Sequence, residues 1–290
     1  MKKFISFFLI IALSGGSGNF FDADASLPFG LINNSLNIVY SATDIRKTEI
    51  FYGDILGLER IEDVKLPGNR TMLRYLVGKT ELKFIVGKND HIKNGDGLFD
   101  SRGIRQMTIL LPMEKKEVIF KRMKAIGLSA PSLTMEKMNT ISFSRGLFND
   151  YDGNHIEILF VNNDSLDFVI GKTHIGLGVS DMNAMGEFLD KILGFETVEG
   201  DGSLRRYNMG LTQVKFWEVP ISKPSITGMP NEILGMSMIQ FVISDVIAAR
   251  DIIASRGGKI HTEPYFVGDL AIIMIVEGPD GILVEFGAAL

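Results

Sequence analysis

The chain has 290 residues, of which 46% are hydrophobic and 22% are charged. These proportions are typical of a globular protein and argue against a disordered, collagen-like or multi-span membrane protein. The net charge is −5 and no block of basic residues stands out, so no nucleic-acid partner is predicted. The absence of cysteine excludes disulfides, thiolate metal sites and cysteine nucleophiles.

The N-terminus has the pattern of a bacterial signal peptide. Lys2 and Lys3 precede an apolar run at 4–13, and small residues end at Ala25, a suitable cleavage site. The apolar run is too short for a bilayer, so no stable membrane span is predicted after cleavage. We therefore expect residues 1–25 to be removed and the protein to be periplasmic or secreted; an uncleaved anchor or a buried strand is the alternative.

The remaining chain contains an internal repeat. Three segments recur in the same order, at offsets that fall from 137 to 132 to 128, as a few loop deletions would produce. The matched segments are 44–59 with 181–196, 74–84 with 206–216, and 152–157 with 280–285. We therefore predict two homologous halves, at 33–162 and 171–290.

Each half divides again into two similar rounds of elements. The first round has a strand at 36–41, a helix at 45–56 capped by Asp44 and ended by Gly57, and then three strands. The second round restarts with a strand at 104–111 and a helix at 113–126. The second half repeats both rounds, with helices predicted at 182–193 and 245–256. The sequence thus predicts an α+β fold in which a β-α-β-β-β module occurs four times.

The capped helix ends in Phe-Tyr-x-x-x-Leu-Gly-x-Glu, at residues 51–59. With the order of elements, this motif resembles the vicinal oxygen chelate superfamily, which includes glyoxalase I, extradiol dioxygenases, fosfomycin-resistance proteins and bleomycin-binding proteins. The resemblance covers nearly all of residues 33–290. It implies two glyoxalase-like domains whose paired modules form cups, with a divalent metal held by side chains of the first and last strands of each module.

The resemblance also implies candidate ligand positions, two in each module. In chain order they are Asn37 and Glu81, Gln106 and Glu157, His174 and Gln213, and Met238 and Glu285. Imidazole and carboxylate suit a divalent metal, an amide oxygen is tolerable, and a thioether is a poor ligand for such an ion.

The way in which the modules pair decides the site. Each half could close its own cup, or the first module could pair with the fourth and the second with the third, as in glyoxalases. The second arrangement brings together Gln106, Glu157, His174 and Gln213, which resembles the Gln/Glu/His/Glu ligands of some glyoxalases. In either arrangement Met238 breaks the two-histidine, one-carboxylate triad of extradiol dioxygenases, which disfavours an iron dioxygenase.

Two lysines offer an alternative to a metal. Lys83 shares a strand face with Glu81, and Lys215 shares one with Gln213. Each ammonium could neutralise a buried carboxylate, such as Glu157 or Glu285, or bind an anionic substrate. Three aromatic residues could form the wall of such a pocket: Trp217, Tyr75 and Tyr207.

The resemblance therefore favours an exported, metal-dependent lyase or isomerase, similar to lactoylglutathione lyase, that acts on a small molecule with vicinal oxygens. One divalent metal (Zn, Ni, Mn or Fe) would be anchored by His174, with Glu157 as base or ligand. The alternatives are a metal-free small-molecule-binding protein like the bleomycin-binding members, and a structural domain with degenerate cups. We expect a small-molecule ligand and a monomer or homodimer.

Overall fold

The computed structural model describes residues 28–66, 70–87, 97–138, 141–162, 173–198, 204–269 and 271–290. The predicted signal peptide at 1–25 lies outside these residues, so export stays a prediction. No described helix has the length and apolar character that a membrane span needs.

The N-terminal half contains the two modules that were predicted. Module 1 follows a short 3-10 turn (Pro28–Gly30) and begins with β1 (Leu31–Ala42). Its helix α1 (Ile45–Thr48) continues as the π-helical η2 (Glu49–Ile55). Three strands complete the module: β2 (Glu59–Leu66), β3 (Arg70–Val77) and β4 (Thr80–Val86). Module 2 consists of β5 (Gly103–Pro112), α2 (Lys115–Ala125), β6 (Thr134–Met138), β7 (Ile141–Asn149) and β8 (His155–Val161).

The C-terminal half repeats this order of elements. Module 3 consists of β9 (Thr173–Val179), α4 (Met182–Glu187), which continues as η4 (Phe188–Ile192), β10 (Glu196–Val198), β11 (Arg205–Met209) and β12 (Thr212–Glu218). Module 4 consists of β13 (Gly235–Ile243), α5 (Val246–Ser255), β14 (Lys259–Val267), β15 (Ala271–Glu277), η5 (Pro279–Gly281) and β16 (Leu283–Ala289). The predicted α+β fold of four β-α-β-β-β modules is confirmed.

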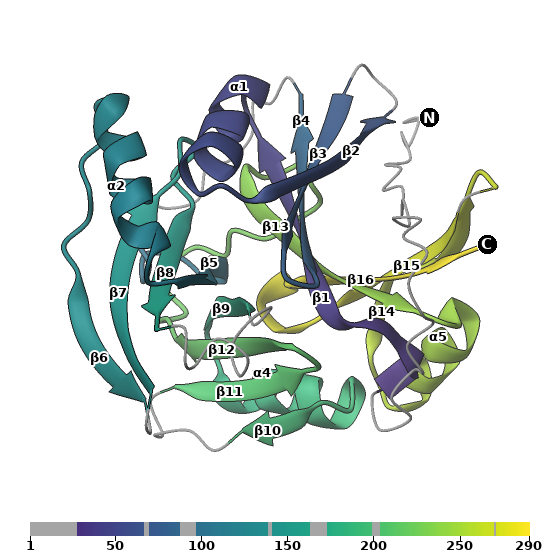
Figure 1. The fold of residues 1–290 in the computed structure, drawn as a ribbon. Coiled ribbons are helices and arrows are strands. Elements are labelled where there is room, and N and C mark those ends of the chain that lie inside the picture. The colour runs from purple at the N-terminus through teal and green to yellow at the C-terminus, as the bar shows by residue number, and fades with distance from the viewer. Residues whose placement is uncertain are drawn as a thin grey trace.

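The sixteen strands form two eight-stranded sheets, and each sheet takes one module from each half of the sequence. The first sheet has the order β14-β15-β16-β13-β1-β4-β3-β2, and the second has the order β10-β11-β12-β9-β5-β8-β7-β6. Module 1 therefore pairs with module 4, and module 2 with module 3, through antiparallel β1–β13 and β5–β9 contacts. Figure 1 shows this exchange: purple β1 lies beside green β13, and teal β5 lies beside green β9.

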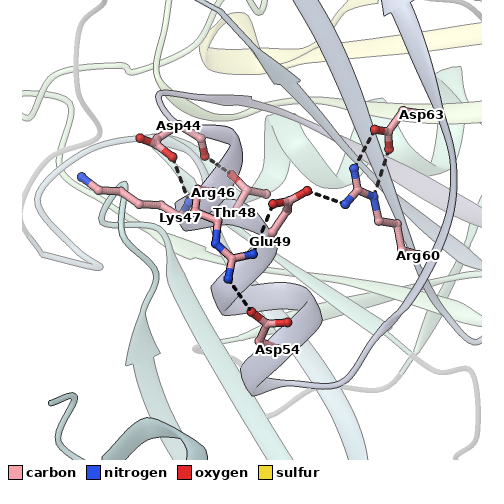
Figure 2. Close-up of polar contacts among 8 residues, drawn as sticks. All are labelled: Asp44, Arg46, Lys47, Thr48, Glu49, Asp54, Arg60 and Asp63. Carbon is pink, nitrogen blue, oxygen red and sulfur yellow. Dashed lines mark hydrogen bonds and ion pairs between the residues drawn. The ribbon is translucent and has the colours of Figure 1, made fainter. Parts of the chain in front are cut away.

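Asp44 caps the first helix, as the sequence predicted. Its carboxylate accepts a hydrogen bond from the backbone N–H of Lys47 at 2.9 Å and satisfies one of the free donors of the first turn (Figure 2). Farther along, Glu49 contacts Arg60 on β2 at 2.5 Å, and Asp63 holds the same guanidinium at 2.6 Å. These contacts fix the helix against the strand that follows it. Asp181 and Asp245 cap α4 and α5 in the same way.

Strand alternation divides each sheet into a face covered by helices and an opposite face, which we call the helix-free face. In module 1, Tyr40 and Phe84 stack with ring centroids 4.5 Å apart and contact Tyr52 of η2. In module 2, Phe160 contacts Phe120 of α2 edge-on. The neighbouring residues along these strands point the other way. Polar residues that alternate with this core therefore lie on the helix-free faces.

A cluster of four buried hydroxyls joins the two sheets. Ser35 and Thr80 belong to the first sheet, and Thr173 and Thr212 belong to the second; each residue is 3% exposed or less. Ser35 Oγ lies 2.7 Å from Thr80 Oγ1 and 2.9 Å from Thr212 Oγ1, while Thr80 Oγ1 lies 2.7 Å from Thr173 Oγ1. A hydroxyl can both donate and accept, so these four groups serve as hydrogen-bond partners for one another across the two sheets.

The two Asp-Gly turns also tie one sheet to the other. Asp152, from the second sheet, accepts hydrogen bonds from the backbone N–H and hydroxyl of Thr43 in the first. Asp280, from the first sheet, accepts from the N–H of Ser180 at 2.7 Å and from its hydroxyl at 2.8 Å, and also forms an ion pair with Arg102. The repeat therefore places an equivalent carboxylate contact at both ends of the interface.

Asp280→Asn should lower the free energy of unfolding by about 1–3 kcal/mol, because one buried carboxylate serves a backbone N–H, a hydroxyl and a guanidinium. Asparagine is the suitable replacement, since the backbone here has a φ of 59°, which asparagine tolerates. Urea unfolding followed by circular dichroism measures the change. Asp251→Asn, on the exposed side of α5, is the matched control; equal losses in the two variants would contradict the assignment.

Candidate functional site

Each sheet carries a row of four polar side chains across its four central strands. In the second sheet, strand register places Gln213 beside His174, His174 beside Thr108, and Thr108 beside Glu157. These residues come from β12, β9, β5 and β8, and we call them the second-sheet row. Three of its members were predicted to lie together, and the structure brings those three together.

The first sheet carries an equivalent row, on strands β4, β1, β13 and β16. Register places Asn37 beside Gln240 and Gln240 beside Glu285, while the backbone N–H of Glu81 donates to Asn37 Oδ1 at 2.9 Å. Asn37 Nδ2 donates in turn to Gln240 Oε1 at 3.1 Å. These four residues form the first-sheet row.

One residue in each row lies two positions farther along its strand than expected. The expected first-strand positions of modules 2 and 4 are Gln106 and Met238. In the structure Thr108 lies beside Glu157, and Gln240 lies beside Glu285. Gln106 and Met238 share the same strand faces one step farther along. Gln106 therefore stays close to the second-sheet row, where it lines a cavity.

Glu157 is held by three donors. Thr108 Oγ1 and Lys215 Nζ each lie 2.6 Å from Glu157 Oε2, and Arg145 Nε lies 2.5 Å from Oε1. The residue is only 3% exposed. Burial alone would raise its pKa, but the Lys215 ammonium, the Thr108 hydroxyl and the Arg145 guanidinium outweigh burial and lower the pKa of Glu157 to about 2. The carboxylate is therefore ionised and paired with cations at neutral pH.

A cavity of about 530 Å³ adjoins this cluster on the helix-free face. Arg145, Lys215, Gln106 and Glu218 supply its polar side chains. The other lining residues are Leu98, Phe99, Met182, Leu204 and Trp217. Its size lies within the range usual for small-molecule sites, and its lining combines a mostly apolar wall with a few convergent polar groups.

Trp217 forms the aromatic wall of this cavity. The indole meets the exposed ring of Phe99 edge-on, with centroids 5.7 Å apart. It lies against Gly176 of β9, where a Cβ would come within 2.7 Å of the indole and 2.9 Å of Gln106 Cβ. Glycine at this position therefore makes room for the indole, a role that the sequence analysis did not anticipate.

The two predicted tyrosines lie elsewhere. Tyr75 packs in the helix-facing core against Phe84 and Tyr52. Tyr207 stacks on Phe216, and its hydroxyl donates to the carbonyl of Gly186. Both tyrosines face the helices, so the structure places them in the core and not in the cavity.

Arg145 and Thr108 are the site residues that sequence reasoning missed. Arg145 occupies on β7 the position that Arg74 occupies on β3, two residues before the residue opposite the glutamate. Arg74 forms the matching ion pair with Glu81 in module 1. Aligning these two hairpins by strand register, instead of by residue count, is the signal that would have identified Arg145.

The first-sheet row is buried, and charged groups of opposite sign lie close together there. Lys83 and Glu285 are 0% exposed, and Lys83 Nζ lies 3.6 Å from Glu81 Oε2, while Arg74 pairs with Glu81 Oε1. Gln240 Nε2 donates to Glu285. An apolar cluster surrounds the row and includes Val39, Met72, Ile85, Met238 and Ile275. Burial raises the pKa of Glu285 to about 7, although the hydrogen bond from Gln240 and the charge of Lys83 oppose this.

Neither row suits a divalent metal. Among the described residues, no three histidine, aspartate or glutamate side chains gather as a metal site would require. In the second-sheet row the single carboxylate, Glu157, is already engaged by an ammonium and a guanidinium, which repel a metal cation. In the first-sheet row Glu81 and Glu285 are separated by two amides and accompanied by Lys83. The metal-ligand roles of Gln106, Glu157, His174 and Gln213 stay predictions that this donor set does not favour.

The comparisons with known proteins agree with the observed fold. The sequence model of the Glyoxalase/Bleomycin resistance protein/Dioxygenase superfamily matches residues 172–286. No curated protein sequence matches the chain.

Two solved structures resemble the chain over most of its length. A candidate dioxygenase from Bacillus subtilis superposes with a TM-score of 0.65 at 17% identity, over 91% of this chain and 86% of that one. Glyoxalase I from Zea mays superposes with a TM-score of 0.60 at 16% identity, over 88% and 92%. At these identities the likeness establishes the fold alone.

Glu285→Gln should remove a pH dependence of stability. The folded-state pKa of about 7 lies above the ordinary value of 4.5, so Glu285 contributes stability below pH 4.5 that is lost as the pH rises through 7. Relative to the variant, the wild type should lose up to about 3 kcal/mol of unfolding free energy between pH 5 and pH 8. Urea unfolding at four pH values measures the difference. Glu187→Gln, at an exposed glutamate, should follow the wild-type curve, and an identical curve for Glu285→Gln would contradict the buried titration.

Proposed function

Because residues 172–286 match the Glyoxalase/Bleomycin resistance protein/Dioxygenase superfamily and 88% of the chain shares the fold of glyoxalase I, we propose that this protein is a metal-free member of that superfamily that binds a small molecule. The ligand would occupy the cavity on the helix-free face of the second sheet. The first-sheet row would have a structural role, since its side chains are buried and Glu81 is engaged by Arg74 and Lys83.

One observation carries this proposal: the contact of Lys215 Nζ with Glu157 Oε2 at 2.6 Å. The ammonium stands beside the only carboxylate of the second-sheet row, where a bound metal would need that oxygen. A dication about 4 Å from one unit charge is repelled by about 8 kcal/mol at an effective dielectric constant of about 20. Arg145 adds a second cation on the other carboxylate oxygen.

The pKa of Glu157 also supports a binding protein over a metal-dependent enzyme. A glyoxalase-type reaction needs a base that accepts a proton near neutral pH, and bases of this kind work best with a pKa close to the working pH. The pKa of Glu157 is about 2, because three donors stabilise the carboxylate. A carboxylate so stabilised is a weak proton acceptor. The chemistry of this residue supports a binding role over a lyase or isomerase.

Elemental analysis of the full chain tests the proposal. After dialysis against trace Zn, Ni, Mn and Fe without chelator, the wild type should retain well below one equivalent of any metal. Lys215→Met removes one cation from Glu157, so residual metal uptake should rise in this variant. One equivalent in the wild type that His174→Ala abolishes would overturn the proposal and restore the metal-dependent enzyme.

We also propose that this binding takes place outside the bacterial cytoplasm, on the pattern of residues 1–25. N-terminal sequencing of the protein from a bacterial periplasmic fraction should begin at Ser26, after cleavage behind Ala25. Recovery of the chain only in the cytoplasm, with its first 25 residues intact, would contradict export and leave the binding proposal unaffected.

A further inference from the structure

We propose that the cavity of the second sheet binds an organic anion, a carboxylate joined to a flat apolar body. This inference rests on the proposed function and names the chemistry of its ligand. It is carried by the charge balance of the cavity, by its unpartnered donors and by the shape of its aromatic wall.

Lys215 and Arg145 both contact the one buried carboxylate at the cavity, Glu157. Two further carboxylates are in contact with water: Glu136, 3.3 Å from the equally half-exposed Arg145, and Glu218 at the rim. An ammonium has three donors, and Glu157 takes one from Lys215. N–H groups of the largely buried Lys215 ammonium thus remain for a ligand.

Two further donors line the cavity without an acceptor. Gln106 Nε2 and Trp217 Nε1 are buried, and neither has a hydrogen-bond partner among the described residues. Gln106 is 2% exposed and Trp217 is 8% exposed. A buried donor that lacks a partner costs about 1–3 kcal/mol. Because all of these groups are N–H donors, the complementary ligand is rich in acceptor oxygens.

Comparison with the first sheet identifies the missing partner. There, Arg74 and Lys83 are matched by two carboxylates, Glu81 and Glu285. In the second sheet Arg206 and Lys215 hold the positions of Arg74 and Lys83, while the position of Glu81 is taken by the neutral Gln213. The second sheet is therefore one carboxylate short of the pattern that its own repeat preserves. A ligand carboxylate would supply it.

The remaining walls define the body of the ligand. Trp217 and Phe99 meet edge-on, and Leu98, Met182 and Leu204 complete an apolar lining. Gly176, which has no side chain, leaves room for the indole. Aromatic side chains arranged in this way favour a flat apolar partner. The volume of about 530 Å³ accommodates a small arylalkanoate.

Three probes of nearly equal shape test the charge requirement: 3-phenylpropanoate, 3-phenylpropanamide and 3-phenylpropylamine. Trp217 is the only tryptophan of the chain, so its fluorescence reports directly on the cavity. The acid should bind at least about tenfold more tightly than the amide, and the amine should give no response. Added salt should weaken the binding of the acid more than that of the amide.

Two variants test the residues. Lys215→Met should abolish the preference for the acid over the amide, whereas Lys191→Met, at an exposed lysine of η4, should retain it. Gln213→Glu restores the missing carboxylate, so it should weaken the binding of the acid at least about tenfold without weakening that of the amide. This second variant keeps Lys215 paired, and it serves if Lys215→Met fails to fold.

Equal affinity for acid and amide, or preference for the amine, would overturn the anionic ligand and leave a metal-free binding cavity. The inference would also be overturned if none of the three probes changed the fluorescence of Trp217. The proposed function fails on a different result, the His174-dependent retention of metal by the wild type. The two failures are therefore distinguishable.

Discussion

The antiparallel contacts of β1 with β13 and of β5 with β9 determine what else this chain can build. Each contact joins a module from one half of the sequence to a module from the other. Because every sheet is completed in this way, neither row of polar residues belongs to one half alone. Glu157 meets Lys215, from the other half, only because module 2 pairs with module 3. The charge balance of the cavity is a consequence of this exchange.

The two rows illustrate how a repeated framework can diverge by single residues. Lys83 and Lys215 hold equivalent positions, as do Glu285 and Glu157. Where Glu81 is present, Lys83 lies near it and the whole row is buried. Where Gln213 replaces that glutamate, Lys215 turns to Glu157 and a cavity adjoins the pair. One neutral side chain thus separates a closed polar core from a candidate binding site.

Much of the fold could be predicted from the sequence because its signals are local. Asp44 and Asp181 cap helices within a few residues of themselves, and Gly57 and Gly194 end them with positive φ. The repeat of these signals revealed the four modules. Module pairing is a long-range choice between two arrangements that bury similar strands, so local patterns left it open. The structure decides it for the exchanged arrangement.

The candidate site was predictable in part. The family resemblance brought Glu157, His174 and Gln213 together, but it gave Gln106 as the position on β5, whereas strand register places Thr108 between His174 and Glu157. Arg145 was missed because it lies on a neighbouring hairpin strand, whose alignment depends on turn length. The tyrosines at 75 and 207 were expected to join Trp217 in the wall of the pocket, whereas strand alternation turns both to the core.

The order of strands along the chain bears on how the protein forms during synthesis. The second sheet is built from consecutive elements, between residues 103 and 218. The first sheet joins the two ends of the chain, so β1 can complete its edge only by pairing with the distant β13. Distant pairings form slowly, and exposed strand edges favour aggregation. We therefore expect the sheet with the cavity to form before the sheet that joins the ends of the chain.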